Sequence, residues 1–279
     1  MLGALLLGGC TAAPPVRKEM GRNTTAVSHH VRPSPSAEEK VGSSSLKATV
    51  HEAMGVGSSL PPPLPEALGW IRSRTLLVLS APSAIPTGLS ATATASSDRY
   101  SVTLYHCPTV LALNDPDIGT GSCGALENYV GDFGSTRYAT SSAAQAALLK
   151  TTSGAPDLYC PSRPISKERP LGEGIMASVL SPEPAASACM VEWREGEWKI
   201  EIVGDLTSGH WEGPAEQVVA YLHTHFLPPA PGIMTVDLAG DGEHTTLAWV
   251  KGDSLYYVGN YHEAIEAAAM AVTDRVITF

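Results

Sequence analysis

The sequence predicts an α+β domain, in which an antiparallel sheet carries helices on one face, preceded by a polar tether. Three observations lead to this prediction: runs of alternating β-prone residues separated by turns, amphipathic helical stretches in the last third, and an internal repeat. The 279 residues are 43% hydrophobic and 16% charged, which is typical of a chain with a folded core.

The N-terminal segment, residues 1–10, is apolar and ends in small residues and a cysteine, as a bacterial signal peptide does. Leu7-Gly8-Gly9-Cys10 resembles a lipobox, the motif after which lipoprotein precursors are cleaved. The resemblance implies that Cys10 is lipidated and becomes the first mature residue, although the usual basic stretch before the apolar run is missing. We therefore expect a protein anchored by lipid to the cell membrane and facing the outside.

Residues 11–65 are rich in Ser and Pro and end in Leu60-Pro-Pro-Pro-Leu-Pro65, which predicts a disordered tether that becomes stiff near its end. The extracytoplasmic domain is then expected over residues 66–279. Residues 61–279 carry 12 Lys and Arg against 24 Asp and Glu. A body this acidic argues against nucleic acid as a partner, and no apolar run approaches the ~20 residues of a membrane-spanning helix.

Four further cysteines, an even number, predict two disulfides in a chain that leaves the cytoplasm. They are Cys107, Cys123, Cys160 and Cys189. Three pairings are open, and we favour Cys107 with Cys123 and Cys160 with Cys189, because short loops close easily. Zinc is the competing interpretation, but the spacings contain no C-x-x-C pair.

The first elements of the domain are a hairpin and a helix. Two runs of small or β-prone residues, 89–95 and 100–106, flank the turn Ser96-Ser-Asp98. After a loop over 114–124, Ser142 caps a short helix that extends to Lys150, and the segment Thr151-Thr-Ser-Gly-Ala-Pro156 ends it.

The repeat occupies residues 191–226 and 247–273, and each copy is predicted to be a hairpin followed by a helix. Trp193 aligns with Trp249 and Gly196 with Gly252. Two-residue turns at Glu195-Gly196 and Lys251-Gly252 would place Trp193 opposite Trp198 and Trp249 opposite Ser254, and glycine supplies the positive φ of such turns.

The two repeat helices have apolar stripes at helical spacing. Asn260 is predicted to cap the second helix, with Glu263 as its reciprocal partner. The first stripe comprises Ala215, Val218, Val219, Leu222 and Phe226, and the second Ala264, Ile265, Ala268 and Val272.

This repeated W-x-x-G hairpin with an Ala-rich helix resembles uncharacterised extracytoplasmic domains in lipoproteins and anti-sigma-factor-type proteins of spore-forming Gram-positive bacteria. The resemblance is clearest over residues 172–273 and fainter over 74–138. It implies a location and a fold type, and it brings no catalytic residue with it.

Asp237, Asp241 and Glu243 lie in a segment that resembles the Asp-rich loops of calcium-binding proteins. Ala239 stands where such loops carry a third ligand, and calcium needs six or more oxygens. The alternative is a glycine-rich turn between two strands. The sequence favours the turn, so no cofactor is predicted, and calcium stays open as the one candidate.

The aromatic residues could form a surface platform for cell-wall glycan, because ring faces stack on the apolar faces of sugars. The candidates are Trp193, Trp198 and Trp249, with Trp211, Tyr256 and Tyr257 nearby in the sequence. The interpretation that the residue types favour is that these rings fill the core between the sheet and the helices.

No hydrolase, P-loop or dinucleotide-binding motif is present. The sequence therefore favours a non-catalytic module that binds or senses a cell-wall glycan or an envelope protein. Two alternatives stay open: an envelope hydrolase whose site is assembled from distant residues, and a structural envelope or spore component.

Overall fold

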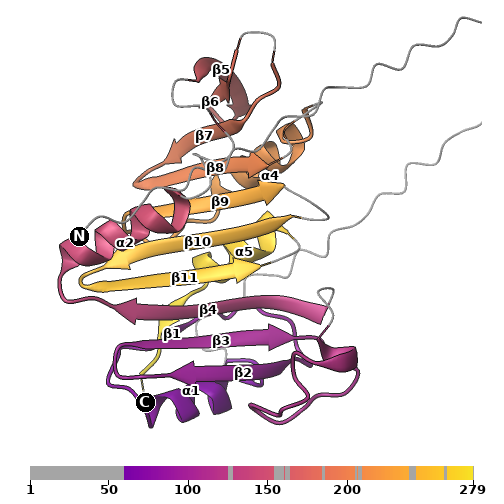
Figure 1. The fold of residues 1–279 in the computed structure, drawn as a ribbon, viewed down its shortest axis with the longest axis vertical. Helices are drawn as coiled ribbons and strands as arrows, with labels where there is room; N and C mark the ends of the chain where they lie inside the picture. Colours follow the sequence, from indigo (N-terminus) through magenta and orange to yellow (C-terminus); the bar gives the residue numbers. More distant parts are fainter. Residues whose placement is uncertain are drawn as a thin grey trace, which may run out of the picture. The chain divides into compact units, whose positions relative to one another are not determined.

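The computed structural model describes residues 60–124, 128–153, 160, 164–183, 186–204, 206, 209–238, 243–260 and 263–278. The chain divides into two units, Met1–Met54 and Gly55–Phe279, and all the described residues belong to the second. They form a large sheet with helices packed against it, which confirms the predicted α+β class (Figure 1). Cys10 and most of the predicted tether lie outside the described residues.

Ten strands form one sheet, and every neighbouring pair except β8 with β9 is antiparallel. From one edge to the other the strands are β2 (Ser90–Ala95), β3 (Arg99–Tyr105), β4 (Tyr129–Arg137), β11 (Ser254–Asn260), β10 (His244–Lys251), β9 (Gly232–Leu238), β8 (Trp198–Gly204), β7 (Met190–Glu195), β6 (Ile175–Ser181) and β5 (Ile165–Gly172). The predicted hairpin over 89–106 is β2 and β3.

The chain reaches the far edge of the sheet before it returns to the middle. After β4 it passes through α2 (Ser141–Ser153) to β5 and then runs inward from strand to strand as far as β8. The parallel pairing of β8 and β9 requires a crossover, and α4 (Glu212–Leu222) lies in that connection. β9, β10 and β11 then complete the sheet against β4.

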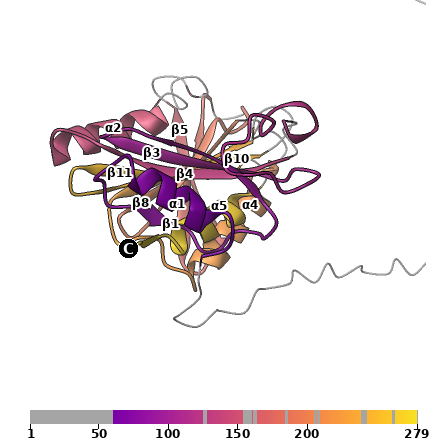
Figure 2. The same ribbon diagram turned by 90° about the horizontal axis from the view of Figure 1, so that it is seen from below.

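Three helices cover one face of the sheet, namely α1 (Leu64–Arg72), α4 and α5 (Ala264–Val272), whereas α2 lies on the opposite face (Figure 2). The sequence predicted that all helices lie on one face of the sheet. This is correct for α1, α4 and α5 and wrong for α2. The larger core lies under the three helices, where β3 turns Tyr100, Val102 and Leu104 inward at every second position.

α2 forms a second, smaller core on the opposite face. Its Ala144 and Leu148 pack with residues of the central strands, Ile233, Ala248, Val250 and Leu255. Strands β9 to β11 are therefore buried on both faces, which explains why β10 has no strict alternation of apolar and polar residues.

The first and last strands of the described chain form a small second sheet. β1 (Ser80–Ala81) pairs with β12 (Arg275–Val276), and the amide of Ile277 donates to the carbonyl of Leu79 at 2.9 Å. α1 begins at Leu64, which is fully buried, so the folded domain begins before the predicted boundary after residue 65.

Both repeat segments form a hairpin followed by a helix, β7-β8-α4 and β10-β11-α5, while a common origin of the two copies stays a prediction. Each hairpin turn lies one residue later in the chain than predicted, so each cross-strand partner differs from the predicted one by two residues. Glu195 pairs with Trp198 and Trp193 with Ile200, while Trp249 pairs with Tyr256. The turns contain Gly196 and Gly252 as their first residues, with φ of 59° and 65°.

Two details of the repeat helices also differ from the prediction. α4 ends at Leu222, so Phe226 lies beyond the apolar stripe and is 81% exposed. α5 begins at Ala264, and Asn260 is the last residue of β11 and not a helix cap.

The four cysteines of the domain form the two favoured disulfides. Cys107 pairs with Cys123, the last residue of the short 3-10 helix η1 (Gly121–Cys123), and Cys160 pairs with Cys189, just before β7. This pairing excludes zinc coordination by these sulfurs. None of the helices in the described ranges is long and apolar enough to span a bilayer.

Candidate functional site

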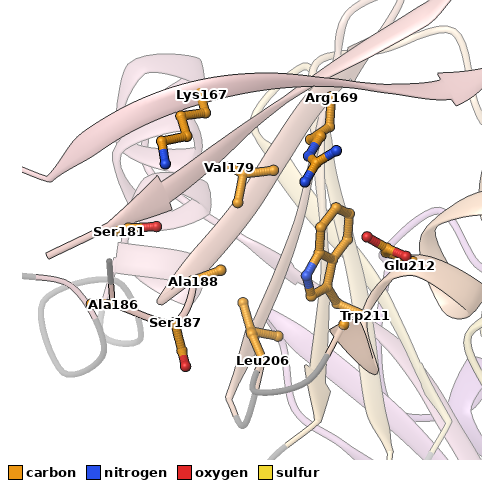
Figure 3. A pocket seen from close by; sticks show the side chains of 11 residues that line it. Lys167, Arg169, Val179, Ser181, Ala186, Ser187, Ala188, Leu206, Trp211 and Glu212 are labelled. Atoms are coloured by element: carbon orange, nitrogen blue, oxygen red, sulfur yellow. The ribbon is translucent and has the colours of Figure 1, made fainter. Parts of the chain in front are cut away.

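A pocket of about 260 Å³ opens where β5 and β6 meet the start of α4 (Figure 3). β5 is the edge strand of the sheet and contacts α4, so the pocket lies at the end of the face that α1, α4 and α5 cover. Pockets for drug-sized ligands are roughly 300–1,000 Å³. This pocket therefore fits a smaller ligand.

One wall of the pocket is cationic. Lys167 and Arg169 lie two residues apart on β5, and successive side chains of a strand point to opposite faces, so both point to the same face. Figure 3 shows the Lys167 ammonium on the side of Ser181 and the Arg169 guanidinium on the side of Trp211. The pair creates a local positive charge on a domain whose net charge is strongly negative.

The floor of the pocket is mostly apolar. Trp211 and Leu206 are 5% and 3% exposed and belong to the large core, and the partly buried Val179 lies beside them. Ser181 is also buried, and its hydroxyl points into the pocket (Figure 3). A ligand would find an apolar surface below it and polar groups around the rim.

Glu212, the first residue of α4, is the one acidic residue among those that line the pocket. Its carboxylate lies on the Trp211 side, toward Arg169 (Figure 3). Within the described residues these two side chains form no ion pair. Both charges are therefore available to a ligand.

Lys167, Arg169 and Glu212 are not among the site residues predicted from the sequence, and Trp211 is there only one of several aromatic candidates. A Lys-x-Arg pair on an acidic domain was the available signal. The sequence could not show that β5 is an edge strand or that α4 begins beside it, because both depend on long-range pairing.

The predicted tryptophan platform is wrong. Trp193, Trp198 and Trp249 are 4%, 3% and 4% exposed, because all three point toward the helices that cover the sheet. The ring centroids of Trp198 and Trp249 are 6.0 Å apart, and the Trp198 indole donates to the carbonyl of Pro228. The favoured interpretation, that these rings fill the core, is the correct one.

The three residues of the candidate calcium loop have different surroundings. Asp237 in β9 lies opposite His244 of β10 in the register of the two strands. Asp241 lies outside the described residues. Glu243 accepts a hydrogen bond from the backbone amide of Ala264 at the start of α5. Calcium binding stays a candidate, and calorimetry at millimolar calcium tests it.

A polar cluster on the face that carries α2 was also missed. The Tyr129 hydroxyl donates to Oδ1 of Asp132 at 2.6 Å, and Tyr257 of β11 also hydrogen-bonds to this carboxylate. Burial raises the pKa of Asp132 and of both tyrosines. With both phenols already bonded to the carboxylate, the cluster joins β4 to β11 and needs no ligand.

The potential metal ligands do not gather into a site in the described part of the chain: no group of three or more His, Cys, Asp or Glu side chains could hold a metal ion there. Comparison with models of protein families, with curated proteins and with solved structures finds no match.

Proposed function

We propose that this protein is an extracytoplasmic lipoprotein, held to the outer side of the cell membrane by a lipid on Cys10 and a tether, and that its domain is a non-catalytic binding module. The partners we propose are a cell-wall glycan or an envelope protein, with the pocket at β5, β6 and α4 as the contact site.

The observation that carries the location is the state of the cysteines. All four cysteines of residues 61–279 pair into two disulfides. Stable disulfides are rare in reducing compartments and common outside the cytoplasm. The fifth cysteine, Cys10, follows the Leu7-Gly8-Gly9 motif, where a lipid would attach.

The residues that line the pocket support binding over catalysis. They supply two cations, hydroxyls and an apolar floor, and neither His nor Cys is among them. A nucleophile needs a base within hydrogen-bond reach, and the one carboxylate of the lining, that of Glu212, lies on the Trp211 side of the pocket and away from Ser181 (Figure 3). The alternative of an envelope hydrolase has no supporting observation in this pocket.

Metabolic labelling tests the proposal. The full chain is expressed in a Gram-positive host that is supplied with radiolabelled palmitate, beside a Cys10→Ser variant. We expect label and membrane association for the original chain, and neither for the variant. Chains recovered without reduction should show no free thiol at the four domain cysteines. An unlabelled chain in the cytoplasmic fraction, with four free thiols, would refute the proposal.

A further inference from the structure

We propose that the pocket at β5, β6 and α4 binds a small organic monoanion: a carboxylate attached to an apolar ring or branched group. The inference rests on the proposed binding function and names its ligand class. It follows from the charges, the floor and the size of the pocket.

The charge of the lining selects an anion. Arg169 forms no ion pair within the described residues, so its positive charge can meet an anion, and Glu212 contributes the one negative charge of the lining. The rest of an acidic domain repels anions over distances of about a Debye length. A ligand with one negative charge can pair with Arg169, whereas a second negative charge would be repelled by Glu212.

The placement of the cations determines where the carboxylate lies. The Arg169 guanidinium lies on the Trp211 side of the pocket, so it can bind an anion that sits over the floor (Figure 3). Guanidinium groups bind carboxylates through two parallel hydrogen bonds. The Ser181 hydroxyl, on the Lys167 side, can donate a further bond to the same group (Figure 3).

The floor determines the rest of the ligand. The partly buried Val179, with the edges of the nearly buried Trp211 and Leu206 below it, forms a small apolar surface that a compact ring or branched chain can contact. At about 260 Å³ the pocket is too small for an extended glycan chain to be enclosed. We therefore expect a compact ligand, or one compact end group of a larger envelope molecule.

Isothermal titration calorimetry on the full chain tests this with three probes of one shape: 3-phenylpropanoate as the monoanion, 3-phenylpropanamide as the neutral analogue and phenylsuccinate as the dianion. We expect the monoanion to bind at millimolar or lower concentration and the other two to bind at least about tenfold more weakly. Raising the sodium chloride concentration should weaken the binding of the monoanion.

Three variants assign the effect to the pocket. Arg169→Gln should weaken binding of the monoanion at least about tenfold. Glu212→Gln should reduce the preference for the monoanion over the dianion. The matched control is Arg194→Gln, which removes an exposed arginine of β7 outside the pocket and should leave the affinity unchanged. Thermal unfolding of each variant shows whether the fold is retained.

The inference would be overturned if the amide bound as tightly as the acid, if Arg194→Gln weakened binding as much as Arg169→Gln did, or if none of the probes bound. These results leave the lipoprotein proposal standing as long as Cys10-dependent palmitate labelling is observed. Loss of labelling with retained selectivity for the monoanion would instead refute the membrane location alone.

Discussion

The carboxylate of Glu243 accepts a hydrogen bond from the backbone amide of Ala264, 21 residues further along the chain. Ala264 is the first residue of α5, and the helix has no side-chain cap from its own N-cap residue, Glu263. Glu243, the residue just before β10, thus caps α5. Its carboxylate accepts from the free amide, and its negative charge complements the helix dipole.

Replacing this cap should destabilise the domain. We expect Glu243→Ala to lower the free energy of unfolding by about 1 kcal/mol, measured by urea denaturation with a calcium chelator present. Glu243→Gln keeps a neutral acceptor, so it should lower the free energy of unfolding by less than Glu243→Ala does. If alanine and glutamine were equally costly, the hydrogen bond would not be the cause. Any stabilisation by added calcium that Glu243→Ala abolishes would support calcium binding.

Gly259 of β11 lies directly opposite Asp132 of β4. A Cβ at this glycine would lie 2.6 Å from Oδ1 of Asp132. We expect Gly259→Ala to lower the free energy of unfolding by about 1–3 kcal/mol. The added methyl group would overlap the Asp132 carboxylate and disturb the hydrogen bond that the Tyr129 hydroxyl donates to it. Urea denaturation measures the loss.

The matched control for Gly259 is Gly69, which lies inside α1 with no other atom within 4 Å of an added Cβ. Gly69→Ala should raise stability by up to about 1 kcal/mol, because alanine favours the helix and restricts the unfolded chain. Equal effects of the two substitutions would contradict the role assigned to the contact with Asp132.

The acidic groups make stability depend on pH. Burial raises the pKa of Asp274 to about 6 from a usual value of 3.8, against the opposing effects of Ser80 and Lys251. Between these values the folded chain binds the proton more tightly than the unfolded chain. Stability should therefore rise as the pH falls from 7 toward 4, and decline as the pH rises through 6.

Denaturation at pH 5 and pH 7.5 checks this dependence. Burial also raises the pKa of Asp132, Glu195 and Glu243, which adds to the same trend. Asp274→Asn should be more stable than the original chain at pH 7.5, by about 1–3 kcal/mol, and should change less with pH. A steady loss of stability from pH 7.5 to pH 5 would refute the prediction.

Each disulfide should stabilise the domain by constraining the unfolded chain. The bridges span sequence separations of 16 and 29 residues, for which the chain-entropy model gives about 3–4 kcal/mol each. Paired Ser substitutions at Cys107 and Cys123, or at Cys160 and Cys189, should lower the free energy of unfolding by amounts of this order. Unchanged stability of both double variants would contradict this.

Local signals in the sequence were sufficient for many of the elements. Alternation predicted the β2-β3 hairpin, the spacing of cysteines favoured the two observed disulfides, and the apolar stripe over Ala215, Val218, Val219 and Leu222 predicted the buried face of α4. The turn register and the cap of α5 were wrong, because a one-residue shift and a cap from another strand leave no local signal.

By itself the sequence determined the α+β class and most of the hairpins and helices, since these depend on periodicity, and it favoured the observed pairing of the cysteines among three because short loops close easily. Only the tertiary structure decided that β4 pairs with β11, that Trp193, Trp198 and Trp249 are buried, and that Arg169 and Trp211 line one pocket. The physical reason is that strand order and the covered face follow from contacts between residues far apart in the chain, where many arrangements satisfy the same local pattern.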